Sequence, residues 1–93
     1  MTPFNQIAYK IIKEQELIIG PVAWSEAKKV EGLRIIDQKT GEIELAGDPK
    51  QVIDRLVAQY ERLFGRASHE VSREAASALI ASLSVDEIPL SLK

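Results

Sequence analysis

Two stretches of helical periodicity meet at Gly65, and their apolar faces fall out of phase there. Before the glycine, large apolar residues recur with the spacing of a core-covering helix, at Val52, Ile53, Leu56, Val57, Tyr60, Leu63 and Phe64. After it, the repeat restarts at Ala67, Val71, Ala75, Ala76, Leu79, Ile80 and Leu83. Extended at about 3.6 residues per turn, the first repeat arrives roughly half a turn from the second. We therefore expect helices over 49–64 and 67–83, reversed at Gly65 so that both apolar faces contact one core.

Two further helices are predicted in the first third of the chain. Thr2 is a suitable N-cap, and the Gly20-Pro21 pair should end the first helix, which we place over 3–19. Its polar face includes Gln15, and its apolar face carries Phe4, Ile7, Ala8, Ile11, Ile12 and Ile18. A short second helix is expected over 21–30, closed by Gly32, with Val22, Ala23, Ala27 and Val30 facing inward.

Between these helices and the later pair, the pattern changes to the alternation of β-strands. Apolar residues alternate with charged ones over 33–37 and 42–46, separated by the turn-forming sequence Asp-Gln-Lys-Thr-Gly. We expect an antiparallel hairpin over 33–46 whose inner face carries Leu33, Ile35, Ile43 and Leu45. A two-stranded ribbon is marginal by itself, so it must pack on helices or pair with another chain.

Local signals fix the remaining boundaries. Asp48 followed by Pro49 is a strong start for the third helix, and Ser68 is expected to cap the fourth. Residues 85–93, interrupted by Pro89, are expected to form an extended C-terminal tail. The chain is therefore predicted to be a helix-dominated α+β protein, with one small domain over 1–84 followed by the tail.

Composition narrows the functional classes. The 93 residues include no cysteine, which removes disulfides and thiolate chemistry, and the net charge is only −2 without a long run of one sign. Residues 1–20 lack the pattern of a signal peptide, and no stretch approaches the length of a membrane span. We expect a soluble cytoplasmic protein without a membrane partner.

The residue pattern does not indicate a catalytic site. His69, the single histidine, is expected near the start of a helix, where the positive end of the helix dipole disfavours a charged ring. The carboxylates are interspersed with basic residues, and no phosphate loop, metal motif or nucleophile motif is present. We therefore expect no enzyme activity, no cofactor and no metal.

Four arginines flank Gly65 and form a candidate site for an anion or a partner. They are spaced seven residues apart in two pairs, Arg55 with Arg62 and Arg66 with Arg73. The same region invites an alternative function as a nucleic-acid-binding regulator, with Ser68–Ser77 as a recognition helix. Glu61 and Glu74 fall where that motif needs a small and an apolar residue, so we do not expect a nucleic-acid partner.

Surplus apolar residues favour a protein-interaction module instead. Ile36 should point away from the inner face of the hairpin, and residues 17–19 exceed what one helical face can bury. We expect an adaptor, regulatory or scaffold-like protein that forms homo-oligomers. The candidate interface residues are Trp24, Ile36, Ile88 and Leu90.

Overall fold

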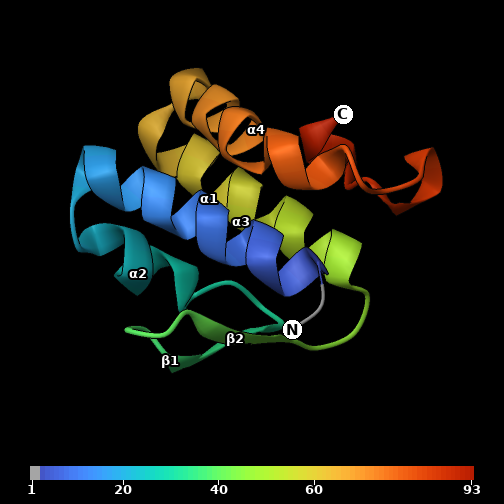
Figure 1. Ribbon diagram of the computed structural model, residues 1–93. Helices are drawn as coiled ribbons and strands as arrows, with labels where there is room; N and C mark the ends of the chain where they lie inside the picture. The colour runs from blue at the N-terminus through green and yellow to red at the C-terminus, as the bar shows by residue number, and fades with distance from the viewer. Residues whose placement is uncertain (1–2) are drawn as a thin grey trace.

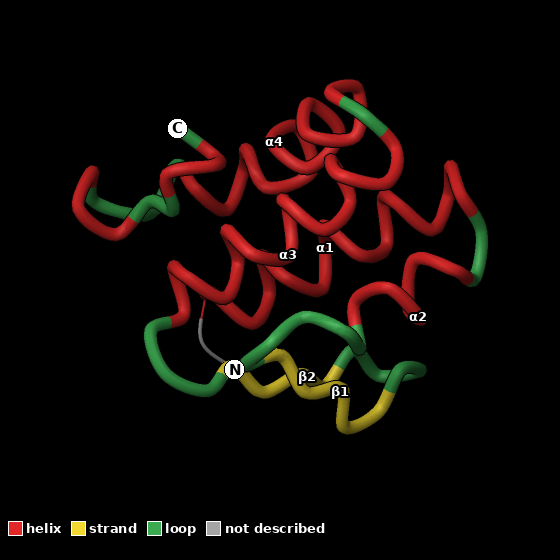
Figure 2. The backbone as a smooth tube through the Cα atoms, turned by 180° about the vertical axis from the view of Figure 1, so that it is seen from behind, coloured by secondary structure: helices red, strands yellow, loops and turns green. Residues whose placement is uncertain are grey.

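The computed structural model, which describes residues 3–93, has a helix-dominated α+β fold with a single two-stranded sheet in that range. In chain order the elements are α1 (Pro3–Ile19), α2 (Val22–Ala27), β1 (Leu33–Asp37), β2 (Glu42–Leu45), α3 (Pro49–Phe64), α4 (Arg66–Ile80) and the short 3-10 turns η1 (Val85–Glu87) and η2 (Leu90–Leu92). Helices α1 and α3 lie between the hairpin on one side and α4 on the other (Figures 1 and 2). The expected fold class is confirmed. The predicted cap at Thr2 lies outside the described residues.

Helix α3 agrees with its prediction at both ends. The Asp48 side chain accepts a hydrogen bond from the Lys50 amide at 3.0 Å, and Pro49 occupies the first turn. The helix ends where Gly65 takes φ +88°, a conformation that favours glycine. One residue therefore reverses the chain, and α4 begins at Arg66.

The start and the packing face of α4 differ from the sequence prediction. Ser68 does not cap the helix but lies buried within its first turn, and α4 ends at Ile80 rather than residue 83. Its fully buried residues are the small ones at spacing four, Ser68, Ser72 and Ala76, whereas Val71 and Ala75 are half-buried. Small side chains let α1 approach closely, and α1 with α4 forms the most extensive helix contact of the fold.

A buried polar seam explains this choice of face. Gln15, which we predicted on the polar side of α1, is buried against α4. Its amide nitrogen donates to the Ser68 carbonyl at 2.8 Å and contacts the Ser72 hydroxyl at 3.2 Å. Ile18, predicted to face the core, is exposed instead. The prediction was wrong for these two residues because hydrogen bonds between distant segments, rather than apolar content alone, select the buried face.

The β-hairpin closes the opposite side of the core. Strand β1 pairs with β2 antiparallel, as expected. Leu33 lies opposite Leu45 and Ile35 opposite Ile43, and a β-bulge follows Ile35. Leu33 and Ile43 are buried, and the Asn5 side-chain amide of α1 donates a hydrogen bond to the Ile43 carbonyl. The inner face of the hairpin therefore packs on α1, as its marginal intrinsic stability requires.

Two segments are more compact than predicted. Helix α2 ends at Ala27 instead of residue 30. After it, the amides of Lys29 and Val30 bond to carbonyls three residues earlier, as in a 3-10 turn, and Val30 is buried in the core. The C-terminal residues do not extend away as a tail: they form η1 and η2, and η2 packs on α3 and α4. Leu92 is only 4% exposed and Pro89 is buried, so apolar burial accounts for the folded C-terminal segment.

Candidate functional site

The four predicted arginines do not share one cleft. Arg55 and Arg62 line one cleft of about 310 Å³ on α3, together with Lys29 from the turn that follows α2. Arg73 lines another, of about 270 Å³, on α4. Arg66 is exposed and lines neither cleft. The predicted gathering of all four into one patch is therefore not observed.

The cleft around Arg55 and Arg62, which we call the basic cleft, has a positive charge excess. Its charged lining residues are three cations, Lys29, Arg55 and Arg62, and one carboxylate, Glu31. Arg55 Nη1 donates to the Glu31 backbone carbonyl at 3.2 Å, and Arg62 Nη2 donates to Gln59 Oε1 at 2.8 Å. Neither guanidinium forms an ion pair with any residue between 3 and 93. Both charges are positioned by neutral acceptors and remain uncompensated by a bonded carboxylate.

Glu26 anchors the basic cleft from beneath. Its side chain is mostly buried and accepts hydrogen bonds from Lys29 Nζ at 3.0 Å and from Gln59 Nε2 at 2.8 Å. These bonds, from Lys29 first and then Gln59, hold the pKa of Glu26 below its usual range. Gln59 of α3 thus links the Glu26 carboxylate of α2 to the Arg62 guanidinium of α3.

The Arg73 cleft has the opposite character. Arg73 is paired with Glu70 of the preceding turn at 3.3 Å, and Glu74 lines the same cleft. Two carboxylates against one guanidinium leave no charge excess for an anion. The spacing of seven residues was therefore a useful signal for Arg55 with Arg62 but not for Arg66 with Arg73.

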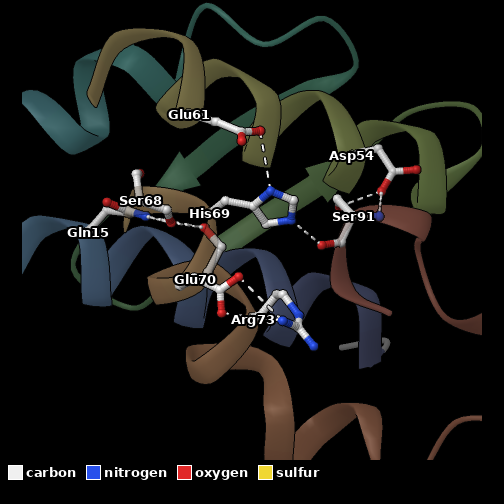
Figure 3. Close-up of polar contacts among 9 residues, drawn as sticks. Gln15, Asp54, Glu61, Ser68, His69, Glu70, Arg73 and Ser91 are labelled. Carbon is white, nitrogen blue, oxygen red and sulfur yellow. Dashed lines mark hydrogen bonds and ion pairs between the residues drawn. The ribbon is translucent and has the colours of Figure 1, made fainter. Parts of the chain in front are cut away.

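His69 connects three parts of the fold rather than standing alone at a helix start (Figure 3). Its Nδ1 lies 3.3 Å from Glu61 Oε1 on α3, and its Nε2 lies 2.6 Å from the Ser91 backbone carbonyl. Asp54 Oδ1 accepts hydrogen bonds from the Ser91 amide at 3.0 Å and from its hydroxyl at 2.5 Å. We call these four residues the C-terminal clasp.

The C-terminal clasp contains the residue types of a nucleophilic triad but not its geometry. A serine nucleophile must give its hydroxyl proton to the histidine, and here the Ser91 hydroxyl is bonded to Asp54. The histidine instead faces the serine carbonyl, which can only accept a hydrogen bond. The arrangement holds the chain end on α3 and α4. Within residues 3–93 no group of three or more His, Cys, Asp or Glu side chains is placed to hold a metal ion.

The candidate interface residues have unequal exposure. Trp24 is only 3% exposed: its ring lies near Tyr9, with centroids 6.1 Å apart, and its indole nitrogen donates to Glu16 Oε2 at 2.9 Å. It is a core residue in this conformation and offers no surface to a partner. Ile88 is half-buried against the core, whereas Ile36 is 44% and Leu90 76% exposed.

Four residues that we predicted to face the core are exposed instead, at one end of the helices: Ile18, Val22, Leu63 and Phe64. Leu17 is 79% exposed and belongs to the same group. The corner between α1 and α2 and the turn between α3 and α4 lie close together at that end in both views (Figures 1 and 2). We call these five residues the apolar end. The surplus of apolar residues at 17–19 was the signal that could have indicated it.

A helix-turn-helix arrangement would need α3 and α4 to be joined by a turn of about three or four residues. Gly65 alone joins them. No helix among residues 3–93 has the length and apolar character needed to cross a membrane. Comparisons with protein-family models, with curated proteins and with solved structures found no match.

Proposed function

We propose that this protein is a small protein-interaction module that works by self-association through its apolar end. The observation that carries the proposal is the exposure of five large apolar side chains at one end of a 93-residue chain. Grouped apolar side chains on a protein surface mark sites of association, while single exposed ones are ordinary.

The neighbouring polar contacts support a rigid surface at this end. Gln15, one turn before Ile18 in α1, is joined to Ser68 in the first turn of α4. The single-residue reversal at Gly65 limits how far α4 can move relative to α3. A preformed apolar surface loses little conformational entropy when a second copy covers it, which favours association.

Covering the apolar end would contribute favourably to the free energy of association. Fully covering a large apolar side chain is worth about 1.5–3 kcal/mol, and Leu17, Ile18 and Phe64 retain substantial exposure. A two-fold arrangement would use each residue twice, because both copies present the same surface.

The test is the mass in solution, measured by light scattering or sedimentation across micromolar concentrations. We expect wild-type protein above the monomer mass and a Leu17→Lys/Phe64→Lys variant at the monomer mass. Ile36→Lys/Leu90→Lys is the matched control, since it changes two exposed apolar residues and the net charge equally. If only the control variant dissociates, the hairpin and C-terminal segment form the interface. A wild-type monomer at all concentrations would overturn the proposal.

A further inference from the structure

We propose that the basic cleft is a binding site for a phosphate group, either free phosphate or a small phosphate monoester. This site is independent of self-association, since the basic cleft and the apolar end share no residue. Its three cations come from segments that are distant in sequence, Lys29 after α2 and the two arginines of α3.

The charge of the basic cleft distinguishes it from the other clefts of the molecule. Its three cations face the Glu31 carboxylate and the Glu26 carboxylate that is bonded to Lys29, so the formal charge around the cleft is +1, in a chain whose net charge is −2. The lining of the Arg73 cleft and that of the cleft between α1 and α4 each have more acidic than basic groups. The hollow beside β2 is lined by Glu42 and Glu44 without a cation. The cleft around Asp54 and Asp86 likewise has more acidic than basic groups. Among these five clefts, only the basic cleft has an excess of cations.

The two guanidiniums retain donors for a ligand. An arginine carries five N–H donors, and Arg55 and Arg62 each use one nitrogen to reach a neutral oxygen within the protein. Those internal bonds orient the guanidinium planes, and the remaining N–H groups are available for bidentate contact with an oxyanion. Lys29 is already paired with Glu26, so its role is to add charge beside the two arginines.

The hydrogen-bond donors and size of the cleft favour phosphate over a single carboxylate. A phosphate monoester carries about −1.5 to −2 at neutral pH and offers three acceptor oxygens. The unused N–H donors of two guanidiniums suit these three oxygens better than the two oxygens of one carboxylate. The volume of about 310 Å³ lies at the lower end of the range for small-molecule sites. Val30 and Ala58 provide apolar wall beside the cations, against which the organic part of an ester can lie.

The experiment is a titration of the full chain, followed by amide and arginine side-chain NMR signals at constant ionic strength. The probes are inorganic phosphate, glycerol phosphate and acetate. We expect saturable shifts at Lys29, Arg55 and Arg62 with both phosphates, and far weaker ones with acetate. Tighter binding of glycerol phosphate identifies an ester as the ligand, whereas equal affinity identifies free phosphate.

Paired variants separate this site from general electrostatic attraction. Arg55→Gln/Arg62→Gln should weaken phosphate binding at least about tenfold, since charge-assisted hydrogen bonds are each worth about 1.5–3 kcal/mol. Arg66→Gln/Arg73→Gln removes the same charge from α4 and should leave the affinity within about twofold. Preserved amide spectra of the free variants show that both remain folded. Equal weakening by the two variants, shifts that do not saturate, or equal binding of acetate would overturn the proposal.

Discussion

The imidazole of His69 donates a hydrogen bond to the backbone carbonyl of Ser91 at 2.6 Å, which ties the start of α4 to the end of the chain. Together with the bonds from Ser91 to Asp54, it fixes a segment that has few other polar contacts with the helices. The C-terminal clasp and the burial of Leu92 therefore act together to keep residues 88–92 folded.

Breaking the clasp should release this segment locally. We expect His69→Ala to speed hydrogen exchange at the amides of residues 88–92 and to cost about 1 kcal/mol, the usual worth of one hydrogen bond. Glu70→Ala, at the exposed neighbouring position, should leave exchange there unchanged. Unchanged exchange in His69→Ala would show that the bonds to Asp54 and the burial of Leu92 hold the segment without His69.

The two buried serines of α4 should respond in opposite directions to removal of the hydroxyl. Ser68 Oγ is buried and has no hydrogen-bond partner among residues 3–93, so Ser68→Ala should stabilise the protein by up to about 1 kcal/mol. Ser72 Oγ contacts both the Gln15 amide and the Ser68 carbonyl, so Ser72→Ala should destabilise it by about 1 kcal/mol. Urea unfolding of both variants measures the difference, and a loss of stability in both would contradict this account.

Glu26 should make stability depend on acid pH. Its hydrogen bonds with Lys29 and Gln59 keep its pKa in the folded protein below the ordinary value of 4.5. Its contribution is therefore complete above about pH 4.5 and is lost as the pH falls through the lower folded value. At pH 7 the Glu26→Gln variant should unfold at a lower urea concentration than the wild type. Its stability should also fall less than that of the wild type when the pH is lowered from 7 to 3. The control Glu44→Gln, on the exposed hairpin face, should show the same dependence of stability on pH as the wild type.

Tyr60 should make stability depend on alkaline pH. Burial, with a smaller effect from Glu26, raises the pKa of its hydroxyl well above the ordinary value of 10. The unfolded chain then loses this proton first, so the contribution is complete below about pH 10 and declines as the pH rises further. In a Tyr60→Phe variant, stability should decline less as the pH rises above 10. At pH 7 the substitution should cost about 1 kcal/mol, because the hydroxyl donates to the Ala23 carbonyl at 2.6 Å.

Features set by neighbouring residues were predictable from the sequence. The bounds of α3 follow from Asp48, Pro49 and Gly65, and the hairpin follows from alternation around a glycine-containing turn. The outward position of Ile36 follows from strand geometry in the same way.

Features set by distant contacts were not predictable. The buried face of α4 depends on Gln15, 53 residues before Ser68, and a glutamine gives no signal of burial by itself. The fold of the C-terminal segment depends on hydrogen bonds from Ser91 to Asp54 and from His69 to Ser91, which join residues far apart in the chain. Likewise Lys29 joins Arg55 and Arg62 only because the turn after α2 folds over α3, so spacing along one helix revealed just part of the basic cleft.

Gly41, at the turn of the hairpin, lies directly against the Tyr9 ring: a Cβ atom there would come within 2.6 Å of Tyr9 Cε1, and the backbone φ is +77°. Tyr9 in turn neighbours Trp24, so a methyl group on this turn would displace the aromatic pair as well as strain the backbone. Homologous chains that have lost the glycine should carry a smaller residue in place of the tyrosine. Positions 9 and 41 are therefore expected to covary during evolution, which would test the contact between them.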